Sequence, residues 1–196
     1  MTTGPAQSRI SYFGYGSLAN PATHRTPILG CRVAELKGWR RHWAPRPDMP
    51  GFPSALLTVA PAPGHSIAGL LIEDALESLP DLDRREAHYD RVPLEAGDFT
   101  LVDDAPAPQS SFVYRARPVE RGGPPLAILR SYLDAVLQGF FQIGGEAAVE
   151  AFVATTDGWE RVIHDDRAAP VYSRPVVLTD EETAVIGRVL ARIGVV

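Results

Sequence analysis

The sequence has one cysteine, no long apolar run and no recognisable leader segment. Cys31 cannot form an internal disulfide, and its neighbours offer no base to activate it, so we expect a small buried side chain. No apolar stretch approaches the ~20 residues that a membrane-spanning helix needs. No basic segment with an apolar core precedes residue 10. These absences predict a cytoplasmic protein without a membrane partner.

An excess of basic residues is also absent. Nineteen lysines and arginines against 24 aspartates and glutamates give a net charge of -5, and the basic residues cluster only in the short segment GWRRHW, residues 38–43. A partner with a phosphate backbone is therefore not favoured, and we expect no nucleic-acid partner. The five histidines lack the spacing of metal ligands, so we expect no metal site.

The length and the patterning of the chain predict one α+β domain over residues 1–196, with a flexible N-terminus at residues 1–8. The first two thirds read as short strands separated by Gly, Pro and Asp clusters. The predicted strands that follow the first one cover residues 31–39, 54–60, 66–73, 98–102 and 111–117.

The last third of the chain has helical periodicity. Apolar residues recur at helical spacing within residues 124–142, and a second helix is predicted at 145–156. The segment 179–194 begins with Thr179 and Glu182 in the spacing of a capping box and continues with an apolar stripe. It carries the clearest helix signal in the sequence.

The segment FGYGSLAN, residues 13–20, breaks the first strand with two glycines around Tyr15. Glycines permit unusual backbone conformations, and they let a small ligand approach the main chain without meeting a Cβ. Successive N–H groups in such a turn can bind an anion. A carboxylate is favoured over a phosphate, because the lysine and the spacing of a phosphate-binding loop are absent. A tight strand-to-helix turn without a ligand explains the motif nearly as well.

A second unusual feature lies in the segment 75–92, whose composition is helical. On a helix, Leu79, Leu82, Glu86 and Tyr89 share one face. An apolar face packs against the core, so the pattern directs the carboxylate of Glu86 inward, while its charged neighbours point elsewhere.

Two interpretations of Glu86 are open. A carboxylate in the wall of a cavity, with a raised pKa, is suited to general acid and base catalysis. Alternatively, Glu86 sits at the edge of the helix and pairs with Arg85, Arg91 or another arginine. The charged segment 164–175 lies between two predicted helices, and we interpret it as a salt-bridged surface loop.

The order of these motifs resembles that of the γ-glutamylcyclotransferase-like superfamily, which includes the ChaC-type and AIG2-like proteins. FGYGSL is followed by LKGWRRHW, a proline-containing loop, ALLTVAPAPGHSIAGLLIED and then LDRREAHYDRV with its glutamate. The resemblance covers roughly residues 10–117. It implies a small mixed β-barrel with flanking helices, here followed by a helical C-terminal third.

The resemblance also implies a function. Tyr15, Gly16, Ser17 and Leu18 would bind the γ-glutamyl group, and Glu86 would be the catalytic acid and base. The implied reaction forms 5-oxoproline from a γ-glutamyl amide, releases the amine and needs no cofactor. The leaving group stays open among γ-glutamyl amino acids, peptides such as glutathione, and γ-glutamylamines. A non-catalytic module that binds a small acid is the alternative from another class.

Overall fold

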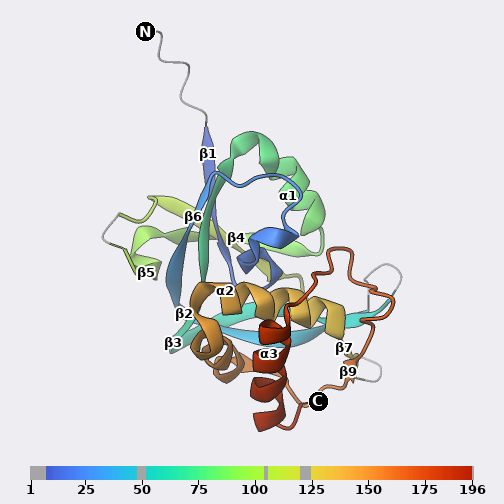
Figure 1. Cartoon of the computed structure of the whole chain (residues 1–196). Helices are drawn as coiled ribbons and strands as arrows, with labels where there is room; N and C mark the ends of the chain where they lie inside the picture. Colours follow the sequence, from blue (N-terminus) through green and yellow to red (C-terminus); the bar gives the residue numbers. More distant parts are fainter. Residues whose placement is uncertain (1–7, 48–51, 104–105, 120–124, 196) are drawn as a thin grey trace.

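The computed structural model describes residues 8–47, 52–103, 106–119 and 125–195, so most of the predicted flexible N-terminus lies outside the described residues. The fold is α+β, as predicted, with one sheet and three α-helices in the described part of the chain (Figure 1). The strands are β1 Arg9–Gly14, β2 Gly30–Arg46, β3 Ser54–Ala75, β4 Tyr89–Glu95, β5 Phe99–Leu101, β6 Ser110–Ala116, β7 Ile128–Leu129, β8 Thr156–Asp157 and β9 Ile163–His164. The α-helices are α1 Leu79–Arg85, α2 Arg130–Ala154 and α3 Asp180–Arg192.

Strand β1 lies inside the sheet, whose main order is β4-β6-β1-β3-β2-β5. It pairs antiparallel with β3 and parallel with β6, and its last four residues are buried. The segment after Gly14 therefore leaves the sheet from a strand that is held on both sides. Among the described strands the main order ends at β4 and β5, and closure of the sheet into a barrel stays a prediction.

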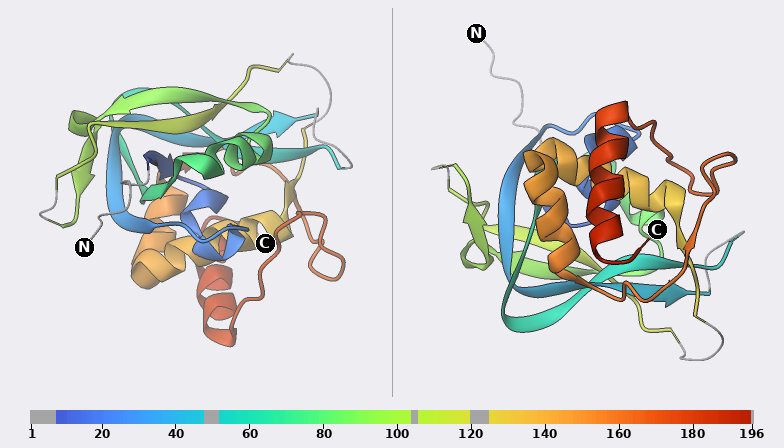
Figure 2. Two further views of the ribbon diagram at one scale, coloured as in Figure 1. Left: turned by 90° about the horizontal axis from the view of Figure 1, so that it is seen from above. Right: turned by 60° about the horizontal axis from the view of Figure 1, so that its bottom comes forward.

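The strands β2 and β3 form a long antiparallel hairpin that curves strongly (Figure 2). The predicted strands 54–60 and 66–73 are parts of this single strand β3. The pairing register shifts between Lys37 and Trp39, where Gly38 has a φ of 78°. Glycine adopts this left-handed conformation without a steric penalty, so it accommodates the irregularity. Cys31, on β2, is exposed, and the prediction of a buried thiol is wrong.

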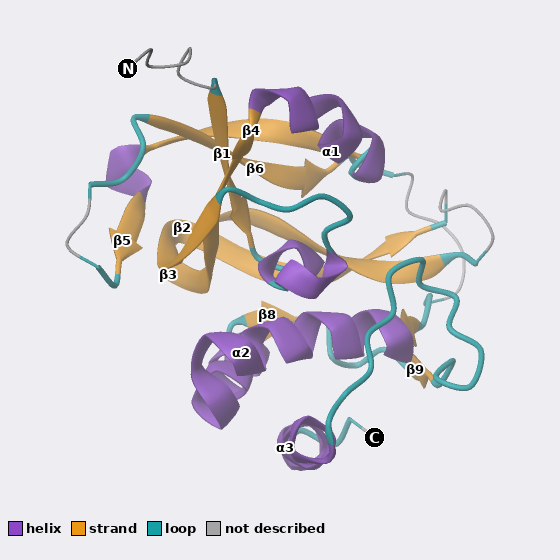
Figure 3. Ribbon diagram, turned by 45° about the horizontal axis from the view of Figure 1, so that its top comes forward, coloured by secondary structure: helices purple, strands orange, loops and turns teal. Residues whose placement is uncertain are grey.

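The helices α2 and α3 form further layers on the sheet, in the order sheet, α2, α3 (Figure 3). Helix α2 bends at Gly144 and Gly145, so its two arms correspond to the two helices predicted at 124–142 and 145–156. The predicted capping box of α3 is present, with Thr179 and Glu182 each bonded to the other's backbone N–H. The apolar stripe of α3 is buried, as predicted. None of the described helices is long and apolar enough to cross a membrane.

Candidate active site

The GYGS segment, residues 14–17, turns from β1 into a short 3-10 helix at Ser17–Ala19. Two hydrogen bonds fix Tyr15: its hydroxyl donates to the carbonyl of Tyr114 at 2.7 Å, and its own carbonyl accepts from Nη1 of Arg41 at 3.3 Å. Burial raises the pKa of the Tyr15 hydroxyl well above its usual value, so the hydroxyl stays a donor. The segment is thus held by strands on either side of β1.

Close packing explains the two glycines of this segment. Neither has a positive φ, but Gly16, with a φ of -132° and a ψ of -131°, lies outside the helical and extended regions, so the unusual backbone conformation expected here is present at Gly16. A Cβ on Gly14 would lie 2.9 Å from the backbone nitrogen of Ala19, which is too close for any side chain. A Cβ on Gly16 would lie 3.3 Å from Cδ1 of Leu57 and 3.4 Å from the hydroxyl of Tyr132. The missing side chain at Gly16 therefore leaves space between these two residues.

Helix α1 is shorter than the predicted helix at 75–92. It ends at Arg85, Glu86 is its C-terminal cap, and Tyr89 begins β4. The helical face proposed for residues beyond Arg85 is therefore wrong, because β4 pairs with β6 along its whole length and this pairing outweighs local helical preference. Glu86 still points inward, with only 14% of its side chain exposed.

Arg85 is more buried than Glu86, with 8% of its side chain exposed, although the helical pattern placed it outside. Its Nη1 donates to the carbonyl of Thr23 at 3.1 Å, and its Nη2 donates to Oγ1 of Thr23 at 3.0 Å and to Oγ of Ser17 at 3.3 Å. Its Nε lies 3.1 Å from Oε1 of Glu86. Arg85 thus connects the end of α1 to the GYGS segment and forms the ion pair that the second interpretation of Glu86 required.

Burial raises the pKa of Glu86, although the charges of Arg85 and Arg174 and a hydrogen bond from Arg85 act in the opposite direction. The effect of desolvation is larger than the effect of the ion pair. A carboxyl group with a raised pKa can both accept and donate a proton closer to neutral pH than an exposed glutamate. Glu86 therefore combines both interpretations: it pairs with Arg85, and its pKa is nevertheless raised, as suits an acid and base catalyst.

Glu86 lies between a small recess and a larger cavity. The recess has a volume of about 30 Å³, which is enough for a water molecule or a group of similar size. All five predicted site residues line it, namely Tyr15, Gly16, Ser17, Leu18 and Glu86. The adjoining cavity has a volume of about 320 Å³ and shares Ser17, Glu86, Tyr89 and Tyr132 with the recess. The two spaces form one candidate active site.

The segment between β9 and α3 forms the outer wall of the larger cavity. In Figure 1 it runs from β9 past the start of α2 towards α1. Its residues 171–174 line the cavity, and the ring of Tyr172 packs edge-on against Tyr132 with the centroids 5.0 Å apart. The interpretation of residues 164–175 as only a surface loop is therefore wrong. Among the described residues, the buried hydroxyl of Tyr172 has no hydrogen-bond partner.

A family model described as "Gamma-glutamyl cyclotransferase, AIG2-like" matches residues 12–133, which include the GYGS segment, Glu86 and Tyr132. The chain belongs to this family. No curated protein matches the sequence.

Several solved structures have the same fold as this γ-glutamyl cyclotransferase, AIG2-like protein, although their sequence identity to it is low. A protein described as "Gamma-glutamyl cyclotransferase" is 14% identical with a TM-score of 0.58, and the match covers 92% of this chain and 99% of that one. The uncharacterized protein loc79017 from Homo sapiens is 15% identical with a TM-score of 0.54, over 91% and 98% of the two chains. YkqA from Bacillus subtilis is 16% identical with a TM-score of 0.53, over 78% of this chain and 57% of that one. These similarities establish the fold.

The larger cavity of this family member is also lined by residues that were not identified as site residues from the sequence, among them Arg85, Tyr132, Tyr172 and Arg174. Tyr132 is part of an apolar helical stripe, and only its hydroxyl distinguishes it there. The cluster of charges at 164–175 was a signal for Arg174, but its contact with the cavity depends on tertiary structure. Within the described ranges, no group of three or more His, Cys, Asp or Glu residues could hold a metal ion.

Proposed function

We propose that this protein is a γ-glutamylcyclotransferase, which converts a γ-glutamyl amide into 5-oxoproline and releases the amine. The observation that carries the proposal is that Glu86 and Tyr15–Leu18, which lie some seventy residues apart in the sequence, surround one recess. Membership of the γ-glutamyl cyclotransferase, AIG2-like family supports the class of reaction.

The reaction is an exchange of one amide bond for another within the substrate. The α-amino nitrogen attacks the γ-carbonyl carbon, a five-membered lactam forms, and the bond to the departing nitrogen breaks. The attacking nitrogen enters as an ammonium group and loses two protons, and the departing nitrogen can take up both. Because the nucleophile belongs to the substrate, much of the rate enhancement comes from holding it in a reactive geometry. Neither redox chemistry nor a group carrier is involved.

Glu86 is the group that we assign to proton transfer. Its ionised carboxylate accepts a proton from the α-ammonium group, and the resulting acid donates a proton to the departing nitrogen. The ion pair joins Arg85 to Oε1, and we assign Oε2 to the substrate. The raised pKa of Glu86 suits both steps, because the acid form is then accessible closer to neutral pH.

The segment Tyr15–Leu18 is assigned to the α-carboxylate of the γ-glutamyl group. The first N–H groups of a helical turn lack acceptors within the turn, and the 3-10 helix begins at Ser17 in the wall of the recess. Arg85 donates to the hydroxyl of Ser17 and supplies a positive charge behind it. The tyrosines around the recess provide an environment of low polarity in which such contacts are strengthened.

The direct test is to incubate the purified protein with glutathione, γ-glutamyl-alanine and γ-glutamyl-ethylamide, and to measure 5-oxoproline by mass spectrometry. We expect 5-oxoproline from at least one of them, and loss of that activity in Glu86→Gln. Saturable binding of these compounds without any 5-oxoproline would favour the small-acid binding module instead.

A further inference from the structure

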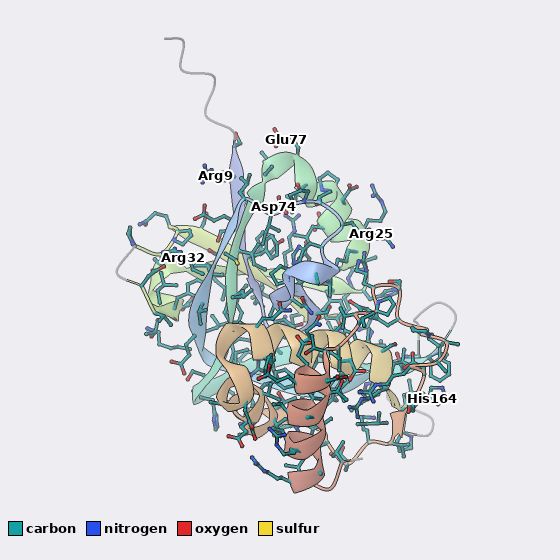
Figure 4. The ribbon with its side chains drawn as sticks, in the orientation of Figure 1. Arg9, Arg25, Arg32, Asp74, Glu77 and His164 are labelled. Carbon is teal, nitrogen blue, oxygen red and sulfur yellow. The ribbon has the colours of Figure 1, made fainter. Side chains whose placement is uncertain are left out.

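Arg174 lines the candidate active site, but the proposed reaction gives it no role. It belongs to the segment between β9 and α3 and lines the cavity of about 320 Å³. It also lines a neighbouring cavity of about 270 Å³, together with Arg25 and Asp74, which are labelled in Figure 4 beside α1. Arg85 is the other cation common to both cavities. Arg174 therefore lies in a wall that the two cavities share, and Glu86 lines the larger of them.

No acidic side chain among the described residues forms an ion pair with Arg174, although the charge of Glu86 acts on it and partly offsets the lowering of its guanidinium pKa. In the described part of the chain, Arg85 pairs with Glu86, whereas Arg174 forms no ion pair. Its Nη1 has one long hydrogen bond of 3.4 Å, to Oγ of Ser173, and its buried Nε has no partner. Burial and the nearby charges of Arg85 and Arg25 lower the pKa of its guanidinium. A partly desolvated cation with an unused donor is unfavourable unless an anion binds there.

The segment that carries Arg174 is fixed to α2. Asp166 accepts hydrogen bonds from the backbone nitrogen of Ser131 at 2.8 Å and from its hydroxyl at 2.5 Å. Arg167 contacts both carboxylate oxygens of Asp134, at 2.6 and 3.0 Å. Because these anchors hold the segment, Arg174 is positioned before a ligand arrives, which lowers the entropic cost of binding.

The position of Arg174 relative to Glu86 indicates which part of a substrate it contacts. The recess assigned to the γ-glutamyl α-carboxylate is lined by Glu86 but not by Arg174. Glu86 also lines the larger cavity, where Arg174 lies. The departing nitrogen has to reach Glu86, so the group attached to this nitrogen extends into the larger cavity on the side of Arg174.

The net charge of the larger cavity gives the same indication. Apart from His88, its charged lining residues are Arg85, Glu86 and Arg174, which sum to one positive charge when Glu86 is ionised. A γ-glutamyl group carries one ammonium and one carboxylate. An amino-acid leaving group adds a second carboxylate and gives a net charge of -1, whereas a simple amine leaves the substrate neutral. The positive charge of the cavity complements the net negative charge of substrates with an amino-acid leaving group.

We propose that Arg174 binds the carboxylate of the departing amino acid, so that the site prefers γ-glutamyl amino acids and peptides over γ-glutamylamines without that carboxylate. The proposal rests on the proposed cyclotransferase activity. It adds a specificity-determining residue from the segment between β9 and α3.

The test compares γ-glutamyl-alanine with γ-glutamyl-ethylamide, which differ only by the carboxylate of the leaving group. For the wild type we expect kcat/KM to be ~10-fold or more higher for γ-glutamyl-alanine, the scale of a hydrogen bond to a charged group. Arg174→Gln should reduce the preference to within ~3-fold, through a higher KM for γ-glutamyl-alanine, with γ-glutamyl-ethylamide little affected. Arg174→Lys should retain part of the preference.

Arg84→Gln is the matched control, because Arg84 is an exposed arginine of α1 that does not line the larger cavity. It should keep the wild-type preference. Equal kcat/KM for the two compounds in the wild type, or a preference that survives in Arg174→Gln, overturns the assignment of Arg174 and leaves the cyclotransferase proposal intact. Absence of 5-oxoproline from both compounds overturns the assignment of Arg174, and its absence from glutathione as well overturns the cyclotransferase proposal. If Arg174→Gln does not fold, equal kcat/KM in the wild type still overturns the assignment, and a wild-type preference that Arg174→Lys reduces supports it.

Discussion

Arg85 and Glu86 are neighbours in the sequence, and their side chains form an ion pair of 3.1 Å at the end of α1. Arg85 also donates to Thr23 and Ser17, so it keeps three hydrogen bonds whatever the state of Glu86. The pair therefore serves as a fixed link between α1 and the GYGS segment. Arg85 is thereby held beside Glu86, whose carboxylate lines the recess.

The first prediction concerns Glu86→Gln. Glutamine keeps the shape of the side chain and an oxygen that can accept from Arg85, but it cannot take up the ammonium proton. Turnover should fall ~100-fold or more, the usual scale for a general base. The melting temperature should hold or rise, because desolvation of the charged carboxylate outweighs its ion pair. Calorimetry and single-turnover formation of 5-oxoproline on one preparation measure both quantities.

A matched control is Asp81→Asn, which removes an exposed carboxylate from the same helix. It should leave turnover unchanged. A strongly destabilised Glu86→Gln variant that cyclises substrate at the wild-type rate would show that Glu86 is a structural ion-pair partner and not the catalytic residue.

The second prediction is a pH dependence. Activity requires ionised Glu86, so kcat/KM should decrease on the acidic side with a midpoint above the ordinary pKa of glutamate, because burial raises the pKa of Glu86. The charge of Arg174 lowers this pKa, so Arg174→Gln should move the midpoint to higher pH. Arg84→Gln should not. A midpoint that stays in place in Arg174→Gln would contradict the proximity of the two charges.

The same pKa has a consequence for stability. A carboxyl group whose folded-state pKa is raised binds its proton more tightly in the folded protein. Its contribution to stability is present below the ordinary glutamate pKa and is lost as the pH rises through the raised value. The melting temperature of Glu86→Gln relative to the wild type should therefore increase with pH over this window, and calorimetry at several pH values measures the difference.

The third prediction separates the two glycines of the GYGS segment. A methyl group at Gly16 would lie 3.3 Å from Leu57 and 3.4 Å from the hydroxyl of Tyr132, and both side chains can move slightly. Gly16→Ala should therefore keep the fold but reduce the space in the recess, with KM raised ~10-fold or more. Gly14→Ala should instead lower stability by ~1–3 kcal/mol, because its methyl group would lie 2.9 Å from the backbone of Ala19.

Thermal melts and KM values for the two variants decide this prediction. If Gly16→Ala melts far below the wild type while KM is unchanged, Gly16 is needed for packing and the recess does not bind substrate.

Local sequence signals predicted the elements that depend on neighbouring residues. The capping box and apolar stripe of α3 lie within one segment, and both are present in the structure. The end of α1 was missed because β4 begins at Tyr89 and pairs with β6, which follows about twenty residues later in the chain. Helical preference within 75–92 contains no information about that partner.

The residues of the candidate site also fall into those that local sequence signals predict and those that depend on long-range contacts. The GYGS segment could be predicted, because a broken strand is visible in the sequence. Glu86 was predicted to point inward from a helical face that in the structure ends one residue earlier, so its direction was right although the helix stops before it. Tyr172 and Arg174 could not be predicted as site residues. Their position depends on the hydrogen bonds between Asp166 and Ser131, which are 35 residues apart in the sequence. A cluster of charged residues in the sequence does not show whether it faces solvent or a cavity.

The last prediction concerns this anchor, through Asp166→Asn. Asp166 is 5% exposed, and its two oxygens accept from the backbone nitrogens of Ser131 at 2.8 Å and Val171 at 2.9 Å. Burial alone would raise the pKa of Asp166, but its hydrogen bonds from Ser131 and Val171 lower it overall. Asparagine has a single acceptor oxygen, so one of these two N–H groups loses its partner in either orientation of the amide. Stability should fall by ~1–3 kcal/mol.

The kinetic consequence distinguishes an anchor of the site from a merely structural contact. When the segment is less firmly held, Arg174 is positioned less well, so the preference for γ-glutamyl-alanine over γ-glutamyl-ethylamide should decrease while turnover of the ethylamide changes little. Hydrogen exchange should increase within residues 165–174. Asp165→Asn is the control, because within the described ranges the exposed Asp165 accepts only from the backbone of Arg167 and asparagine can do the same. Unchanged exchange and an unchanged substrate preference in Asp166→Asn would show that Arg174 does not depend on this anchor.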